Sequence, residues 1–515
     1  MTRLRAEPRC IAFVLLAWAA LAQAQGTGGR GGVFSVSPRL SATQTLTDNL
    51  QLTERDKDAA LITTLSPGLS ITSRTGALQG SLDYAMNGIL YAKTDQPSRV
   101  QNALSATARA ELVADALYVD MRAGIGQQSV SAFGLQSAPS LDGQGGQGGV
   151  SSLTNSNQRE TLTYSVSPVL QGKLGGLASY VLRGEFSGSD ARGSELGDSR
   201  GRGTSLQVNQ LGARAFAWWL QLNTHETRSS GSASAPRSTS LRLGANYRPD
   251  PDWVFSANAG QERSNYLGNA QSSGTTAGAT ASWTPSTRTR IGLDLQRHAY
   301  GNSHGLTLEH RLARSVWRYS DQQSTVVGNT GSAGGARSNY DQFFLLFASQ
   351  EPDPVKRDTF VRAYLQSQGL SADAPVAGGF LSTGPSRLRN QQLAVTLQGV
   401  RASLTGQFNR SVSGRLGSNV NQGSLADSSK IEQRSMSLSA SYQLGATSGL
   451  TLIATRQESA GDTSRQSTQL TSYFANWTAR LGNQLAAQLG ARHSRFEGVT
   501  SYTENAVLLT LTQQF

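Results

Sequence analysis

The sequence predicts an all-β fold: a transmembrane antiparallel β-barrel of about 22 strands, between 20 and 24, with a small helical insert. Composition, residue alternation and the spacing of turns together predict it. The 515 residues are 37% hydrophobic and 16% charged, with 55 glycines, whereas ordinary globular chains carry about 25% charged residues. This balance disfavours both a large soluble core and a charged disordered chain. A barrel needs only modest hydrophobicity spread along its strands.

Apolar and polar residues alternate with period two almost everywhere after Val33. Ile291, Leu293 and Leu295, for example, alternate with polar residues. The same pattern recurs in segments 117–125, 240–248 and 484–492. Successive side chains of a strand point to opposite faces, so each segment has one apolar and one polar face. Beyond the first 24 residues no run of about 18 apolar residues occurs, which excludes transmembrane helices.

Two kinds of connection alternate along the chain between segments of roughly 11 to 15 residues. Tight turns are expected at Arg74–Gly76, Ala114–Asp115, Pro249–Pro251, Pro285–Ser286, Gly399–Val400 and Gly482–Asn483. Longer Gly- and Ser-rich loops are expected at Asp48–Ala59, Ser137–Ser156, Gly188–Gly203, Ser229–Arg237 and Arg415–Ser428. Short turns on one side of the membrane and long loops on the other are typical of outer-membrane barrels.

Tryptophans are expected at one membrane interface. Six of them lie within a few residues of a short turn: Trp218, Trp219, Trp253, Trp283, Trp317 and Trp477. Aromatic rings collect at membrane interfaces because they combine an apolar body with a polar group. Ordinary core aromatics would not be restricted to one side of the barrel, so this placement favours the barrel over a soluble β-sandwich.

The first 24 residues are typical of a cleaved secretory signal. Three arginines precede an apolar run from Cys10 to Ala22, and Ala22-Gln23-Ala24 has small residues at the two positions read by signal peptidase. We therefore expect a signal peptide at 1–24, a Gly-rich linker at 25–32 and the barrel at 33–515, located in the outer membrane of a Gram-negative bacterium. Phe515 ends an amphipathic segment and is similar to the signal read by the barrel assembly machinery.

Between residues 337 and 370 the apolar period changes from two to that of a helix. Helical spacing is followed by Phe343, Phe344, Phe347, Phe360 and Tyr364. Asp353 can cap a helix with Pro354 at its first position, and Gly369 follows as a stop. We expect two short helices, packed into the lumen as a plug or against the barrel rim, with a protein-interaction surface as the alternative. Because successive strands alternate in direction, counting the predicted strands assigns this insert to the side of the long loops.

The basic charge is expected on the inner wall. The net charge of +12 becomes about +10 after loss of the signal peptide. The polar-face arginines proposed to line the lumen are Arg122, Arg242, Arg248, Arg288, Arg290, Arg480 and Arg492. Rings of arginine favour anionic solutes. The alternative is that these arginines pair with Asp120, Asp294 and Glu309 to brace the wall. Nucleic acid is excluded as a partner because no basic-aromatic motif accompanies the charge.

No catalytic, cofactor or metal site is predicted. Gly143–Gly148 matches G-x-G-x-x-G by letter, but no strand–helix context surrounds it, so it is interpreted as a surface loop. Asp294, His298 and Ser303 are a possible hydrolytic combination, yet no nucleophile motif accompanies them. The histidines lack carboxylates at metal-ligand spacing. The chain is therefore not expected to be an enzyme.

Several segments resemble outer-membrane barrels encoded with the PEP-CTERM/exosortase exopolysaccharide system. The resemblance lies in Ser37–Leu40, Thr47–Leu50, Leu61–Leu69, the helical insert with Glu351–Pro354 at its centre, and Gly379–Leu381. It would cover essentially the whole chain after the signal peptide. The resemblance implies an association with polysaccharide export and brings no catalytic residues.

The sequence thus favours a pore or export component for exopolysaccharide secretion, with passive passage gated by the helical insert. Its expected partners are outer-membrane lipid, the barrel assembly machinery, and an anionic polysaccharide or export-system proteins. Two alternatives remain open: a non-conducting scaffold that anchors surface material, and a general anion-favouring porin.

Overall fold

The fold is taken from a computed structural model of the chain. It describes residues 33–92, 94, 96–137, 155–193, 196, 198–212, 215–230, 235–268, 270–327, 344, 357, 361, 380–382, 384–417, 422–482 and 484–515. The predicted signal peptide, the linker and the Gly143–Gly148 motif lie outside these residues. No helix in this part of the chain is long and apolar enough to cross a membrane.

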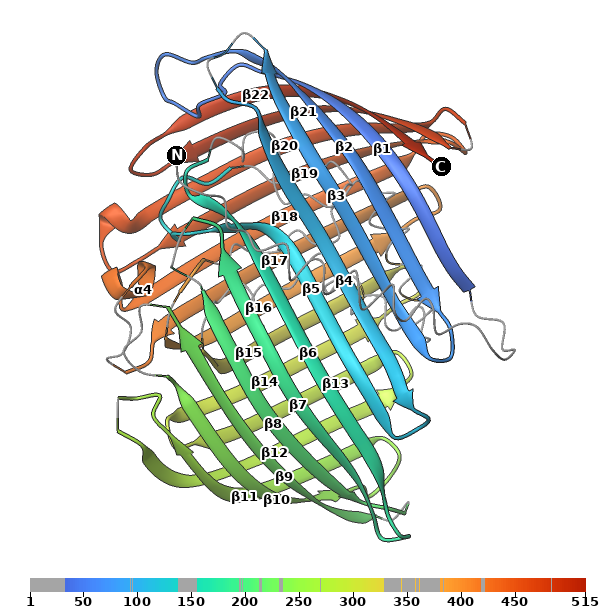
Figure 1. Ribbon diagram of the computed structural model, residues 1–515, viewed down its shortest axis with the longest axis vertical. Coiled ribbons are helices and arrows are strands. Elements are labelled where there is room, and N and C mark those ends of the chain that lie inside the picture. Colours follow the sequence, from blue (N-terminus) through green and yellow to red (C-terminus); the bar gives the residue numbers. More distant parts are fainter. Residues whose placement is uncertain are drawn as a thin grey trace.

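One antiparallel sheet of 22 strands makes up the molecule (Figure 1). The strands are β1 Val33–Thr47, β2 Ala60–Arg74, β3 Leu78–Ala92, β4 Arg99–Val113, β5 Leu117–Ser129, β6 Gln158–Leu174, β7 Ala178–Ala191, β8 Ser199–Gln210, β9 Phe216–Ser229, β10 Arg237–Tyr247, β11 Trp253–Ser264, β12 Ser272–Ser286, β13 Thr289–His298, β14 Gly301–Arg311, β15 Ser315–Val327, β16 Pro385–Gln398, β17 Ala402–Arg415, β18 Lys430–Gln443, β19 Ser448–Ala460, β20 Ser467–Arg480, β21 Leu485–Glu497 and β22 Tyr502–Gln514. A short helix, α4 Ser424–Asp427, precedes β18. The predicted strand number and fold class are confirmed.

The sheet closes on itself. Each strand pairs with its neighbours in sequence, and β22 returns to pair with β1, from Arg39 opposite Gln514 to Thr47 opposite Ala506. Figure 1 shows the blue first strand beside the red last strands. Closure pairs the first strand with the last, so that the sheet has no open edge along this seam, as a sheet inside a lipid bilayer requires. This closed ladder explains how a chain of modest hydrophobicity holds its shape.

The connections fall into two sets, one at each end of the barrel. The end that carries the predicted tight turns is called the short-turn end, and the opposite end is called the long-loop end. At Gly188–Gly203 the expected loop is shorter than predicted, because β7 continues to Ala191 and β8 begins at Ser199. At the long-loop end two connections are also short, between His298 and Gly301 and between Glu497 and Tyr502. All the predicted tight turns therefore lie at one and the same end of the barrel.

Strand pairing determines which residues face the lumen. Residues directly opposite each other in neighbouring strands share a face. Thr43 on β1 is buried and hydrogen-bonds through its hydroxyl to Thr510 on β22. Following the pairs from Thr43 through all the strands returns to Thr510 on the same face, so the assignment closes consistently. The face of Thr43 is predominantly polar and the opposite face carries large exposed apolar side chains, as in a membrane barrel with a wet interior.

The aromatic residues support this orientation. Trp253 and Trp283 are paired on the outer face beside the short turns, with ring centroids 5.1 Å apart. Trp317 and Trp477 lie on the same face at the same end, as does Trp218. Trp219 faces the lumen instead and donates its indole N–H to Ser256 Oγ at 3.3 Å. The predicted one-sided tryptophan belt is confirmed, with this one residue turned inward.

Glycines also occupy crowded positions within the strands. Gly244 is paired with Trp219, and a Cβ at Gly244 would lie 2.3 Å from the indole ring. Gly188 stands opposite Tyr164, where a Cβ would lie 2.5 Å from the phenol. An aromatic ring covering a glycine fills the space of the missing side chain. Glycine in these strands therefore makes room for rings on the neighbouring strand.

The predicted helical insert lies between β15 and β16, at the long-loop end, as expected from strand parity. Of the residues 337–370 the structure describes Phe344, Arg357 and Val361, and each has helical conformation. Val361 is fully buried, and the Arg357 guanidinium lies 4.8 Å from the Phe344 ring centroid. The other proposed plug residues, Phe343, Phe347, Phe360 and Tyr364, lie outside the described residues.

Candidate functional site

The loop after β5 crosses the mouth of the barrel at the long-loop end. Its described part, residues 130–137, contacts lumen-facing residues of β19, β20 and β22. β5 and β20 are about seven strand positions apart by the shorter way round, or roughly 34 Å along the wall at about 4.8 Å per strand. Direct hydrogen bonds over that separation require the loop to run through the mouth instead of following the rim.

Gln136 and Leu135 make the contacts with the far wall. Gln136 donates its side-chain amide to Ser459 Oγ and Thr468 Oγ1, at 3.4 and 3.3 Å. Its backbone carbonyl accepts a hydrogen bond of 2.7 Å from the Tyr502 hydroxyl. Leu135 packs against an apolar cluster formed by three strand residues, Leu470, Phe496 and Tyr502, and by Leu52 of the β1–β2 connection. The loop is thus held by both polar and apolar contacts on the lumen side.

Two further segments meet this loop. Ala132 donates its backbone N–H to Ser424 Oγ of α4 at 3.0 Å. Leu381, beyond the helical insert, donates its N–H to the carbonyl of Ser129 at 2.9 Å. Ala132 also packs in a buried apolar cluster with Phe380, Leu425 and Ile431. We call residues 130–137, 380–382 and α4 together the mouth segment. It joins β5 to the connection between β17 and β18, about ten strand positions away.

Local hydrogen bonds give the loop its shape. Asn157 donates its amide to the carbonyls of Ser131 and Leu135, at 3.0 and 3.2 Å, and its Oδ1 accepts the Ser131 N–H at 2.8 Å. Asn155 donates to Leu135 as well, at 2.9 Å. Asparagine side chains commonly organise turns in this way. The sequence prediction placed a long loop at Ser137–Ser156 and assigned no role to residues 130–136. The pair of asparagines before β6 is a signal in the sequence that could have indicated an ordered turn here.

Five of the proposed lumen arginines share the face of Thr43: Arg122, Arg242, Arg290, Arg480 and Arg492. Arg248 and Arg288 lie outside the strands, in connections at the short-turn end. Arg122 and Arg290 are exposed within the barrel interior. Arg492 is instead buried, and its Nη2 lies 2.9 Å from Glu504 Oε1. The lumen wall therefore presents some solvent-accessible guanidinium groups and uses others in ion pairs.

Ion pairs between strands that lie one or two positions apart brace the inner wall. Asp120 pairs with Arg109 at 2.6 Å and with Arg183 at 3.0 Å. Arg39 donates two hydrogen bonds to Asp83, at 2.8 and 2.6 Å. The predicted bracing role of Asp120 is therefore seen, but with arginines that the sequence prediction did not name.

The prediction that the basic charge belongs to the inner wall is only partly correct. Many cations lie on the outer face near the long-loop end, among them Arg389, Arg410 and Arg434. On β18, for example, Arg434 shares a face with Met436 and Leu438, two exposed apolar residues. Alternation distinguishes two faces of a strand, but it does not say where along the strand the outer face leaves the membrane.

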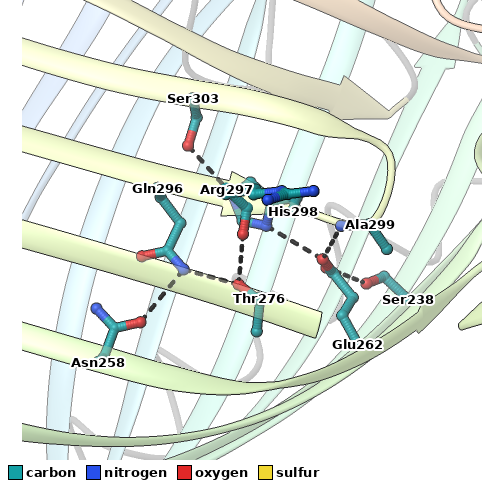
Figure 2. A network of polar contacts seen from close by, with 9 residues as sticks. All are labelled: Ser238, Asn258, Glu262, Thr276, Gln296, Arg297, His298, Ala299 and Ser303. Atoms are coloured by element: carbon teal, nitrogen blue, oxygen red, sulfur yellow. Dashed lines mark hydrogen bonds and ion pairs between the residues drawn. The ribbon is translucent and has the colours of Figure 1, made fainter. Parts of the chain in front are cut away.

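A polar network joins β10, β11, β13 and β14 inside the barrel at the long-loop end (Figure 2). His298 contacts Glu262 Oε2 through Nδ1 at 3.2 Å and Ser303 Oγ through Nε2 at 3.1 Å. Glu262 is buried and accepts further hydrogen bonds from the Ala299 N–H and the Ser238 hydroxyl, at 3.1 and 3.2 Å. Asp294, the carboxylate considered from the sequence, is not part of this network; Glu262 takes that place.

The order serine, histidine, carboxylate is also that of hydrolase triads, so the surroundings of the network matter. Ser303 lies within the β14 ladder opposite Gln296, on a regular strand and not on a sharp turn that would present a nucleophile. The Glu262 carboxylate accepts hydrogen bonds from three donors, which lie on β10, on β13 and in the β13–β14 connection. The geometry is that of a brace holding the β13–β14 hairpin against β10 and β11.

Two tyrosines in the adjacent loops extend this brace. Tyr300 stacks on His298 with ring centroids 4.9 Å apart, and Tyr266 contacts Tyr300 at the same centroid distance. Burial raises the pKa of Tyr266 to about 12, with a contribution from the Glu262 charge. Burial likewise raises the pKa of Tyr300 strongly, and Glu262 adds to the effect. Both phenols are therefore neutral under physiological conditions and pack as aromatic rings.

Among the described residues, no group of three or more His, Cys, Asp or Glu side chains could hold a metal ion. An apolar groove of about 780 Å³ does occur, at the short-turn end, lined by Leu397, Leu404, Tyr442 and Leu452 among others. Pairing places these four residues on the outer, apolar face. The groove is therefore part of the lipid-facing surface and not an entrance to the lumen.

No protein-family model and no curated protein sequence matches the chain. Solved structures with a similar fold include the siderophore receptor PirA from Pseudomonas aeruginosa, at 9% identity and a TM-score of 0.44, covering 94% of this chain and 81% of that one. The FrpB iron transporter from Neisseria meningitidis is 11% identical with a TM-score of 0.48, covering 93% and 82%. The ferric enterobactin receptor PfeA from Pseudomonas aeruginosa is 12% identical with a TM-score of 0.45, covering 95% and 82%. The likeness is one of barrel architecture and carries no conclusion about substrate.

Proposed function

We propose that the protein is an outer-membrane pore or export component that serves exopolysaccharide secretion, with passage through the lumen controlled at its mouth. The long-loop end would then face the cell surface, as in other barrels with short periplasmic turns. The observation that carries the proposal is a lumen with exposed arginines, such as Arg122 and Arg290, beneath a mouth crossed by residues 130–137. Rings of cationic side chains favour anions, and an acidic polysaccharide is a polyanion.

The resemblance of Ser37–Leu40, Leu61–Leu69 and Glu351–Pro354 to barrels of the PEP-CTERM/exosortase system supports the choice of polysaccharide as cargo. In this proposal the mouth segment and the helical insert at 337–370 act together. Leu381, eleven positions after the end of the insert in the chain, donates its N–H to the carbonyl of Ser129 at the start of the mouth loop. A displacement of the insert would therefore pull directly on the segment that crosses the mouth.

Planar-bilayer conductance tests the pore. The wild-type protein is compared with a variant lacking Asn339–Gly369, with correct folding of both checked by heat-modifiable gel migration. We expect low conductance from the wild type, a several-fold rise from the deletion variant, and a preference for anions in both. Absence of conductance in both folded forms would contradict the pore proposal. Loss of surface polysaccharide in a strain lacking the gene is the expected result for the export role.

A second candidate is a non-conducting scaffold that anchors surface material through its loops. The contacts from Gln136 to Ser459, Thr468 and Tyr502 favour it, because they tie opposite walls together across the mouth. In that case the deletion variant stays silent in the bilayer, while loss of the gene still alters the cell surface. The two measurements together separate the candidates.

A further inference from the structure

The outer face of the barrel changes abruptly from apolar to charged toward the long-loop end. On β18 the outward residues Tyr442, Leu438 and Met436 are exposed and apolar, and the next two outward residues are Arg434 and Glu432. The same change occurs on the neighbouring strands, from Leu393 to Arg389, from Phe408 to Arg410, and from Leu452 to Arg456. The charged residues therefore begin at a common level on adjacent strands.

The distances match a membrane boundary. The exposed outward residues Leu444 and Met436 are eight positions apart, which is about 27 Å along a strand and about 20 Å along the axis of a barrel with strands tilted by about 40°. The apolar band of such barrels is about 25 Å tall. Arg434 thus lies where the hydrocarbon ends and lipid headgroups begin.

The charged level extends over most of the barrel. Its outward cations are Arg200, Arg202, Arg228, Arg237, Arg263, Arg297, Arg387, Arg389, Arg410, Lys430, Arg434, Arg456 and Arg495. Its outward carboxylates are Glu160, Asp190, Glu226, Asp321, Glu432, Glu458 and Glu497. Cations outnumber carboxylates by about two to one, so the level is net positive.

Strands β1–β7 and β22 carry no outward cation at this level. On β1 to β4 the outward residues near the long-loop end are uncharged, and they include the exposed apolar residues Leu46, Leu61, Leu90 and Val100. A general need for solubility at the rim would put charge on these strands as well. The restriction of the cations to β8–β21 indicates that they serve a particular contact on that side.

Within the charged level, β15 to β18 carry a connected network of side chains. Arg389 donates to both oxygens of Asp321, at 2.9 and 2.5 Å, and Gln391 donates to Asp321 at 2.9 Å. Arg410 donates to Gln391 at 3.0 Å and to both oxygens of Glu432, at 2.8 and 3.1 Å. We call this network, together with Arg434, the arginine network.

Arg434 completes the network. It donates through Nε to Glu432 at 2.7 Å, and its side chain remains 54% exposed. Arg389 and Arg410 also keep 39% and 31% of their side-chain surface exposed. Two carboxylates hold three guanidinium groups in fixed orientations without neutralising them. A guanidinium has five N–H donors in a planar fork that matches a phosphate group, so an array of this kind is preorganised for anions that bear several oxygens.

We propose that the outward cations of β8–β21, centred on Arg389, Arg410 and Arg434, bind the phosphate groups of lipid A, the phosphorylated glycolipid of the outer leaflet. The proposal rests on the outer-membrane location in the proposed function and is separate from the cargo. Only a lipid phosphate combines negative charge with a fixed level at the edge of the hydrocarbon. Its acyl chains would lie on the apolar face below, against Leu393 and Met436.

The test is binding of defined lipids to the purified, folded barrel in detergent, measured by native mass spectrometry. The probes are bisphosphorylated lipid A, dephosphorylated lipid A and inorganic phosphate. The variant R389Q/R410Q/R434Q is compared with the matched control R122Q/R290Q/R480Q, which removes the same charge from the lumen face. R434Q alone changes the most exposed member and serves if the triple variant does not fold.

We expect wild type and lumen control to bind bisphosphorylated lipid A alike, and the triple variant to bind it at least tenfold more weakly, since each basic residue near an anionic lipid surface contributes about 1 kcal/mol. For R434Q a loss of about fivefold is expected on the same basis. Dephosphorylated lipid A should bind all forms weakly. Equal affinity of wild type and network variants for lipid A overturns the proposal. If inorganic phosphate displaces lipid A at a concentration similar to that of the lipid, the choice of a lipid as the ligand is overturned.

Membrane fractionation keeps this result distinct from the proposed function. A protein recovered outside the outer membrane contradicts the proposed function whatever its lipid affinity in detergent. A protein recovered in the outer membrane, with no phosphate discrimination, contradicts only the lipid proposal.

Discussion

Tyr502 donates its hydroxyl to the backbone carbonyl of Gln136 at 2.7 Å, joining residues 366 positions apart in the chain. The bond ties the loop that crosses the mouth to the lumen side of β22. Tyr502 itself is buried in the apolar cluster that receives Leu135. A single side chain therefore holds the mouth loop through both a polar and an apolar contact.

Tyr502→Phe should loosen the mouth loop while keeping the ring in place. The loss of one buried hydrogen bond costs about 1 kcal/mol, which corresponds to roughly a fivefold increase in the open population of the loop. Single-channel recording is expected to show a matching rise in open probability. Tyr473→Phe on the outer face serves as the control and should leave gating unchanged. Identical gating of Y502F and wild type would show that this bond does not limit opening.

Arg122→Gln and Arg290→Gln together should weaken anion preference. Both guanidinium groups are exposed on the lumen face, so each adds positive potential to the pathway. The reversal potential under a salt gradient is expected to move toward that of a cation-selective pore, with folding unaffected. Arg495→Gln, on the outer face, is the matched control. A change in reversal potential of equal size in the control would show that the lumen arginines do not determine the anion preference.

Removing one partner of the Arg492–Glu504 pair should destabilise the closing seam of the barrel. The side chains are only 2% and 1% exposed, and Glu504 also accepts a hydrogen bond from Thr47 on β1 at 3.0 Å. Leaving a buried charge without its partner costs about 3–5 kcal/mol. Urea unfolding of R492A in detergent is expected to show a loss of this order.

The exposed pair Arg495–Glu497 on the same strand provides the comparison. Arg495→Ala should cost about 1 kcal/mol or less, because solvent screens such a pair. A double variant, R492M/E504L, should recover part of the loss at the buried site, since no unpaired charge remains. Equal destabilisation by R492A and R495A would contradict the importance of the buried pair.

Alkaline pH should weaken the long-loop end through Tyr266 and Tyr300. The folded barrel raises the pKa of Tyr266 from 10.0 to about 12 and that of Tyr300 in the same direction. A raised pKa in the folded state means that the stabilising contribution is complete below pH 10 and is lost as the pH rises through about 12. Tyrosinate absorbance is expected to show phenols that ionise well above pH 10, and Y266F should remove one of them. Ionisation of all tyrosines near pH 10 in the folded protein would contradict their burial.

Ser303 is expected to be unreactive, because its contacts fit a structural brace. A fluorophosphonate probe, which labels activated serines, should not modify it. Ser303→Ala should lower the stability of the β13–β14 hairpin by about 1 kcal/mol, the contribution of a typical hydrogen bond, as measured by hydrogen exchange. Labelling of Ser303 that disappears in H298Q would show that the Ser303–His298–Glu262 network is catalytic.

Much of the fold follows from local pattern. Alternation at Ile291, Leu293 and Leu295 predicts the apolar outer face that the pairing of β13 gives them. The tight turn before Trp253 predicts a short-turn end with an aromatic belt. These features depend on residues close together in the chain, where the pleat of a strand fixes which side chains share a face.

The candidate site depends on residues that are distant in the chain. Gln136 meets Tyr502, and Ala132 meets Ser424, only because 22 strands close into a ring and bring opposite walls to a common mouth. The same holds for Glu262, which replaces Asp294 beside His298 because β11 and β13 lie two strands apart. A local pattern contains no information about which loops meet across a lumen.

The sequence by itself determined the barrel, its strand number and the two faces of each strand, because period-two alternation and turn residues act within a few positions. The tertiary structure alone decided the path of the mouth loop and the height at which each strand leaves the membrane. Arg434 and Met436 share one face of β18, so alternation places them together. Only the position of that face relative to the neighbouring strands sets one of them against hydrocarbon and the other at the level of the lipid headgroups.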